Sequence, residues 1–155
     1  MRPPAHRAAA LLLTGVLASG LVGVLAGCSS DAAARGSLSQ SAGTAAATAR
    51  SAGLVLGLNG NDRLLPTVLD TGLTDAADTL GQEAQSVATM TALGGIGASR
   101  DRVLADIRAA QDAVASAQRA VATGRDSGGA LDRQRLRLDK LAKELDATSK
   151  RLEGE

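Results

Sequence analysis

An apolar residue at every third or fourth position is the feature that most constrains this fold, and the spacing recurs in four segments. Such spacing places the apolar side chains on one face of an α-helix. No segment combines strict apolar/polar alternation with the β-branched residues that strands favour. The sequence therefore predicts an all-α protein. The four stripes are Leu38, Ala42, Ala45, Ala49, Ala52 and Leu56; Leu69, Leu73, Ala76, Leu80, Ala84, Val87 and Thr91; Val103, Ile107, Ala110, Val114, Ala117 and Val121; and Leu131, Leu138, Leu141, Leu145 and Leu152.

Glycine-rich and asparagine-rich breaks separate these stripes at 58–62, 94–97 and 124–129. Glycine and asparagine tolerate positive φ and end helices. Pro66 suits the first turn of the second helix, and Ser99 is a candidate N-cap for the third. Four helices of roughly 20 to 27 residues with short connections are typical of an up-down-up-down bundle. The 94–97 turn and the C-terminus would then share one end with the segment before residue 37.

A second topology is open because apolar or small residues sit seven apart from Val103 to Leu152. One long C-terminal coiled-coil helix through 124–129, giving three helices in all, fits this repeat. Three glycines within that helix would cost about 3 kcal/mol in helix propensity. The sequence thus favours a hairpin between a third and a fourth helix.

The chain has no Phe, Tyr or Trp. Its core must be aliphatic, and binding modes that stack bases or quaternary amines on aromatic rings are excluded. At 155 residues it is long enough for a single domain with a modest core.

The first 27 residues have the layout of an export signal, with Arg2 and Arg7 ahead of an apolar run. The run ends in Leu25-Ala26-Gly27-Cys28, which resembles the lipobox of bacterial lipoproteins. The resemblance implies cleavage between Gly27 and Cys28 and a diacylglycerol thioether on the Cys28 sulfur. An ordinary cleaved signal and an uncleaved membrane anchor are the alternatives.

This interpretation divides the chain into a signal peptide at 1–27, a lipidated tether at 28–36 and a helical bundle at 37–155. The mature protein would be lipid-anchored on the extracytoplasmic face of the cell membrane. Basic residues predicted at the lipid end are candidates for contact with anionic head groups, offset by Asp101, Glu153 and Glu155. The candidates are Arg100, Arg102, Lys150 and Arg151.

Catalytic and metal-binding residues are scarce in the predicted mature domain. The single histidine, His6, lies in the signal, and the single cysteine, Cys28, would be acylated. The predicted mature domain therefore cannot use histidine for acid-base catalysis, and it cannot bind a metal through histidine nitrogen or cysteine sulfur. Without Arg2 and Arg7 the formal charge falls from +1 to −1, which argues against nucleic-acid binding. We expect no enzymatic activity, no cofactor and no metal.

The resulting expectation is a membrane-anchored, non-catalytic helical module that docks an envelope protein partner. One alternative is a structural envelope lipoprotein that self-associates, because the chain resembles the small murein lipoprotein in being lipidated, helical and poor in aromatics. That family ends in a lysine joined to peptidoglycan, whereas this chain ends Arg151-Leu152-Glu153-Gly154-Glu155. A third alternative, a ligand-binding lipoprotein, is disfavoured because a tightly packed Ala/Leu bundle offers little room for a pocket.

Overall fold

A computed structural model describes residues 29–59, 65–91, 94–123 and 129–154 of the chain. In these ranges the secondary structure is helical and contains no strand. The prediction of an all-α protein is confirmed. The elements are α1 (Ser29–Asn59), α2 (Pro66–Thr89), the short 3₁₀ helix η1 (Gly94–Ile96), α3 (Gly97–Ala122) and α4 (Ala130–Gly154).

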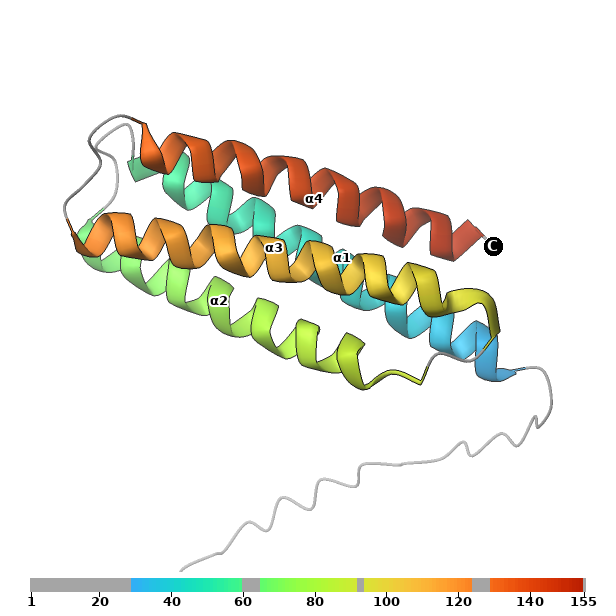
Figure 1. The fold of residues 1–155 in the computed structure, drawn as a ribbon. Helices are drawn as coiled ribbons and strands as arrows, with labels where there is room; N and C mark the ends of the chain where they lie inside the picture. Colours follow the sequence, from blue (N-terminus) through green and yellow to red (C-terminus); the bar gives the residue numbers. More distant parts are fainter. Residues whose placement is uncertain (1–28, 60–64, 92–93, 124–128, 155) are drawn as a thin grey trace, which may run out of the picture.

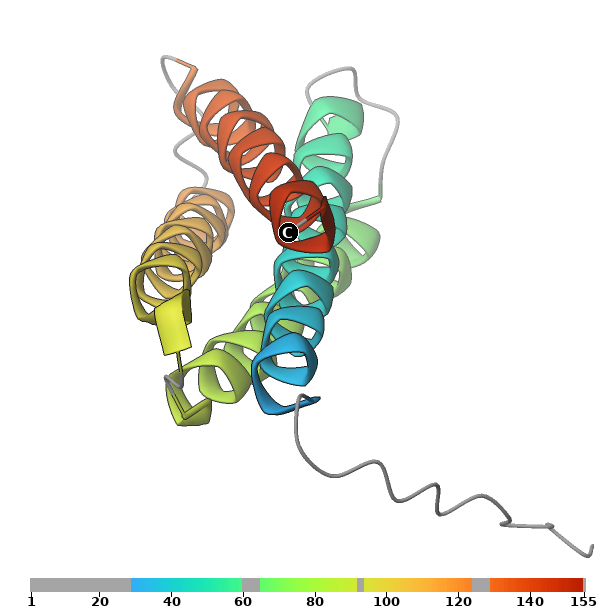
Figure 2. The ribbon, with the colours of Figure 1, turned by 90° about the vertical axis from the view of Figure 1, so that its right-hand side faces the viewer.

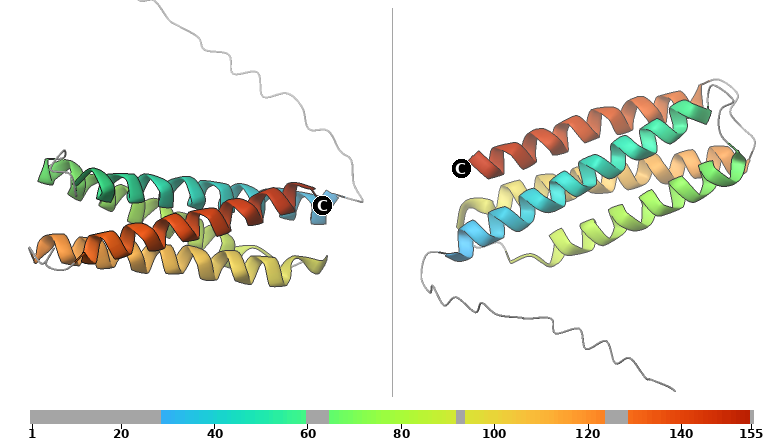
Figure 3. Two further views of the ribbon diagram at one scale, coloured as in Figure 1. Left: turned by 90° about the horizontal axis from the view of Figure 1, so that it is seen from above. Right: turned by 180° about the vertical axis from the view of Figure 1, so that it is seen from behind.

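The four α-helices run alternately up and down side by side, as Figure 1 shows. Helices α2 and α4 each pack against both α1 and α3 and make no contact with each other, so they occupy opposite corners of a four-helix bundle. The start of α1, the junction of α2 with α3 and the end of α4 lie at one end, which we call the proximal end (Figure 1, Figure 3). The opposite end, where α1 and α3 finish and α2 and α4 begin, is the distal end. The predicted topology is confirmed.

Helices α3 and α4 form a hairpin. Helix α3 ends at Ala122 with Thr123 as its C-cap, and α4 begins at Ala130 and packs back along α3. Gly129, directly before α4, has a φ of 70°, a conformation that costs little only for glycine. The alternative of one long C-terminal coiled-coil helix is therefore wrong.

Helix α1 begins earlier than the sequence indicated. Residues 28–36 were expected to form a tether, but the helix is already present at Ser29. Three consecutive alanines from Ala32 have high helix propensity, and Asp31 in the first turn interacts favourably with the helix dipole. As a helix, residues 29–36 rise about 12 Å, compared with about 27 Å for an extended tether. Helix α1 therefore starts directly after Cys28, and its first buried core side chain is Leu38.

The start of α3 also differs from the prediction. Ser99 lies inside the helix, which begins at Gly97 directly after the 3₁₀ turn. The N-cap residue is Ile96, which makes no capping side-chain hydrogen bond. Ile96 is instead buried, so packing of its side chain fixes this helix start.

The core is aliphatic, as the lack of aromatic residues requires, and follows the four predicted stripes. Ala84 and Val121 are only half-buried, and Thr91, which lies beyond the end of α2, is exposed. The largest fully buried side chains come from all four helices: Leu38, Leu73, Leu80, Val87, Val103, Ile107, Val114, Leu138 and Leu145.

Helices α1 and α4 form the most extensive helix pair in the bundle, and small residues let their backbones approach (Figure 2). A Cβ on Gly43 would lie 3.4 Å from the Ser149 Oγ, and one on Gly53 would lie 2.9 Å from the Asp139 Oδ1. The buried Ser39 and Ser149 are joined reciprocally. The Ser149 Oγ donates to the Ser39 carbonyl at 2.9 Å, and the Ser39 Oγ lies 3.1 Å from the Ser149 carbonyl oxygen.

Two leucines on α4 provide a matched test of this core. Leu138 is fully buried, whereas Leu136, two residues earlier and on the opposite face of the helix, is 59% exposed. We predict that Leu138→Ala lowers the free energy of unfolding by about 2–5 kcal/mol, because it leaves a cavity. Leu136→Ala should change it by less than about 0.5 kcal/mol. Urea unfolding followed by circular dichroism measures both, and similar losses for the two variants would contradict this core.

Gln134 occupies a core-stripe position between Leu131 and Leu138. Its side-chain carbonyl oxygen is buried without a hydrogen-bond donor in the described part of the chain. An unsatisfied buried acceptor costs about 1–3 kcal/mol, so Gln134→Met should raise the midpoint of urea unfolding. A lower midpoint would show that this oxygen has a donor in solution.

Candidate functional site

The predicted lipid attachment site precedes the bundle. Gly27 and Cys28 lie outside the described residues, but Cys28 directly precedes Ser29, the first residue of α1. Arg100 and Arg102 lie in the first turns of α3, and Lys150 and Arg151 lie near the end of α4. All four are therefore at the proximal end.

Two of these four basic residues already have partners within the bundle. Arg100 forms an ion pair with Asp101 at 2.8 Å and donates to the Met90 carbonyl at 3.1 Å, which satisfies a backbone acceptor at the C-cap of α2. Lys150 pairs at 2.8 Å with Asp146, which lies four residues earlier on the same face of α4. Their charges are partly neutralised before any head group approaches.

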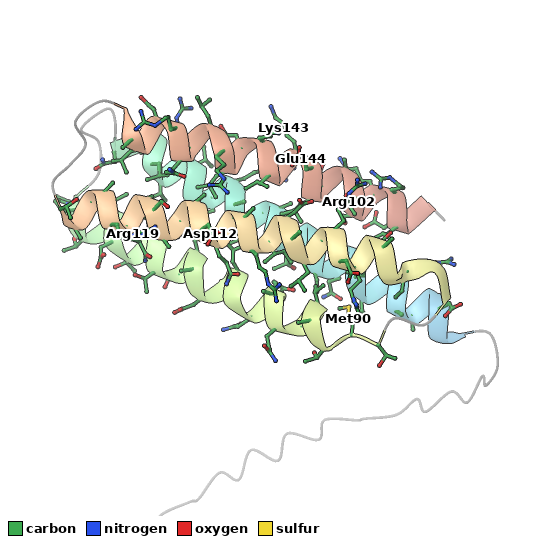
Figure 4. The ribbon with its side chains drawn as sticks, viewed as in Figure 1. Met90, Arg102, Asp112, Arg119, Lys143 and Glu144 are labelled. Carbon is green, nitrogen blue, oxygen red and sulfur yellow. The ribbon has the colours of Figure 1, made fainter. Side chains whose placement is uncertain are left out.

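The other two, Arg102 and Arg151, are brought together in a hollow of about 350 Å³ between α3 and α4. The hollow is also lined by Asp106 and Glu144, and Figure 4 shows Arg102 and Glu144 on facing helices. Burial raises the pKa of Asp106 and the nearby Glu144 raises it further, while Arg102 opposes the shift. This hollow is charge-balanced and is not a free cationic patch.

The raised pKa of Asp106 gives a prediction about pH. The folded chain holds this proton more tightly than the unfolded chain, so stability falls as the pH rises from the unfolded value of 3.8 through the raised folded value. The full cost is present at neutral pH. Asp106→Asn should therefore raise the melting temperature at about pH 7, with a gain that shrinks toward about pH 3. A lower melting temperature at neutral pH would show that the Arg102 attraction outweighs burial.

The distal end carries a different kind of surface. Every large apolar side chain that is exposed in the described part of the chain lies there. Leu65 and Leu54 are the most exposed, at 69% and 68%. We call this set the distal surface. Its members are Leu54 and Leu58 on α1, Leu65 and Val68 at the start of α2, and Leu136 on α4.

Two surface grooves flank the last turns of α1 within the distal surface. The distal groove, of about 490 Å³, lies between α1 and α4. The other, of about 370 Å³, lies between α1 and α2 and is mainly apolar around Val55 and Val68. The α1 segment that carries Leu54 and Leu58 is thus a ridge between two grooves. The distal groove is lined by Gly53, Leu54, Gly57, Leu58, Asp132, Arg135 and Asp139.

The charges in the distal groove are unequally paired. The Arg135 Nε lies 3.3 Å from an Asp132 carboxylate oxygen. Within the described ranges, Asp139 makes no hydrogen bond or ion pair, and its carboxylate lies over Gly53. The groove therefore combines an apolar rim on α1 with a charged side on α4, where Asp139 is unpaired within the described ranges.

The distal surface was not predicted from the sequence, although leucines outside the apolar stripes indicated it. Leu54, Leu58 and Leu136 lie outside the apolar stripes of their helices, and a leucine off the stripe of an amphipathic helix faces solvent. What the stripes did not reveal is that these leucines meet at one end of the bundle.

The described residues contain no group of three or more His, Cys, Asp or Glu side chains placed to hold a metal ion. None of the described helices combines the length and apolar character needed to cross a bilayer. No protein-family model, curated protein or solved structure shows a significant match to this chain.

Proposed function

We propose that this protein is a lipid-anchored cell-envelope lipoprotein whose non-catalytic helical module docks a protein partner through the distal surface. One observation carries the proposal: the exposed apolar side chains gather at the end of the bundle opposite the start of α1, which follows Cys28 directly. Contiguous exposed apolar surface on a small protein marks an interaction site.

The anchor rests on the lipobox resemblance. Acyl chains on Cys28 would hold the protein at the extracytoplasmic face of the membrane, since each buried methylene contributes about 0.8 kcal/mol. Because α1 begins at Ser29, the bundle has little chain with which to move away from the lipid. The neutralised basic residues at the proximal end support attachment through the lipid more than through head-group charge.

The length of the bundle supports docking away from the membrane. Helix α1 has 31 residues and spans about 46 Å at 1.5 Å per residue. A bundle standing on its proximal end would present Leu54, Leu58 and Leu136 far from the lipid surface. A partner in the envelope could then reach the distal surface without entering the bilayer.

Self-association through the same surface is the second candidate, and it is favoured by the same exposed leucines. Binding of a small ligand inside the bundle is disfavoured because core positions along all four helices are filled by aliphatic side chains. Both candidates predict contacts at the distal end, so the mass of the bound species separates them.

Photo-crosslinking in the native host tests the proposal. We expect the full chain with a benzophenone amino acid at Leu58 to form a discrete adduct. The mass of this adduct should differ from that of two copies of the chain. The same probe at Ala105, an exposed position on α3, is the matched control and should form none. Cys28→Ser should remove the adduct by releasing the anchor.

Equal adducts at positions 58 and 105 would contradict a distal docking site. An adduct composed of two copies of the chain would favour self-association. A membrane-bound, cleaved Cys28→Ser protein would contradict the lipid anchor.

A further inference from the structure

The shape of the distal groove fits one kind of occupant. Gly53 and Gly57 line it from α1, beneath the side chains of Asp139 and Arg135. Leu54 and Leu58 on α1 rim one side, and Asp132, Arg135 and Asp139 on α4 form the other. A groove between two helices with an exposed apolar ridge along one side accepts the apolar edge of a third helix, as ridges pack into grooves.

Other modes of peptide recognition do not fit this surface. Strand addition requires a free sheet edge, and the described ranges contain no strand. Polyproline segments bind in grooves lined by aromatic side chains, and this sequence has none. Insertion of an amphipathic helix beside the apolar ridge of Leu54 and Leu58 is the mode that the residues support.

The charge of the groove predicts which charged side chains that helix carries. Arg135 is paired with Asp132, whereas Asp139 has no partner in the described part of the chain. The last turn of α1 also carries no cation at the negative end of its helix dipole. A cationic side chain on the occupant would complement this charge, and an anionic one would be repelled.

The described helices of a second copy do not include such a helix. Three or more apolar anchors at i, i+3 or i+4, and i+7 are needed to fill a groove in this mode. No described helix of the protein exposes more than two large apolar side chains, and Leu136 stands alone on α4. The described helices therefore do not supply the occupant, and we take it to be a helix of another protein.

We infer that the distal groove binds an amphipathic helix of a partner protein, with leucine-like residues against Leu54 and Leu58 and a lysine or arginine at Asp139. This inference rests on the proposed docking function and names the chemistry of the partner. Asp139 sets the charge preference, and the two leucines supply the apolar contact.

Two designed peptides test the inference. The first is a 21-residue peptide with leucine on one face of a helix, lysine beside it and glutamine elsewhere, and the second replaces each lysine with glutamate. Binding of the fluorescent peptides to the lipidated protein in phosphatidylcholine nanodiscs is measured by anisotropy, with empty nanodiscs subtracted. We expect the lysine peptide to bind at least tenfold more tightly than the glutamate peptide.

Three substitutions assign this preference to the groove. Asp139→Lys should reverse the order of the two peptides, and Leu54→Glu should abolish binding of both while helicity is unchanged. Asp112→Asn on α3 removes an exposed carboxylate far along another helix and is the matched control, with no expected effect (Figure 4). Equal affinity for both peptides, or an unchanged order in Asp139→Lys, would overturn the inference.

The crosslinking and peptide-binding experiments distinguish failure of this inference from failure of the proposed function. If the adduct at position 58 forms in cells but neither peptide binds, docking stands and the helix-in-groove mode is overturned. If the peptides behave as expected but no adduct forms, the groove chemistry stands and the proposed function is overturned.

Discussion

The close approach of α1 and α4 is the contact on which the rest of this structure depends. It joins the first and last helices of the bundle and therefore closes the ring of four. Gly43 and Gly53 on α1 allow the backbones to approach, and the reciprocal Ser39–Ser149 hydrogen bonds satisfy polar groups that the approach buries. Arg50 on α1 adds an ion pair with Asp146 on α4 at 3.2 Å.

The same pairing produces two different ends. At the proximal end it holds the start of α1, and hence the residue after Cys28, beside the end of α4. At the distal end the glycines continue to Gly57, and the α4 residues opposite are the charged Asp132, Arg135 and Asp139, which line a groove beside the exposed Leu54 and Leu58. One set of glycines thus serves helix packing along most of α1 and leaves a groove open near its end.

Much of the fold could be predicted from the sequence because stripe spacing and glycine breaks are local signals. The stripes of leucine and alanine identified the core, and the glycines of 124–129 favoured the hairpin that the structure has. The predicted start of α1 was wrong because Ser29 and Ser30 resemble a linker. The helix propensity of the residues from Ala32 onward extends the helix back to Ser29. The predicted start of α3 was wrong because burial of the Ile96 side chain outweighs capping by Ser99.

The candidate site was harder to predict because it depends on contacts between helices. The sequence placed Arg100 and Lys150 at the proximal end, but it could not show that Met90, Asp101 and Asp146 are their partners. Equally, it showed leucines off the apolar stripes without showing that three helices bring them to one end. Residue periodicity assigns a face to each helix, and only the packing decides which faces meet.

The central claim is that the protein has a lipid end and a docking end. Fluorescent labels on single added cysteines test it most directly, because the only native cysteine, Cys28, would carry the lipid. One label replaces Ala98 at the start of α3, and the other replaces Leu58 on the distal surface. In the lipidated protein in bilayers with nitroxide head groups, this account predicts strong quenching at position 98 and little at position 58. Equal quenching at both positions, or stronger quenching at 58, would contradict it.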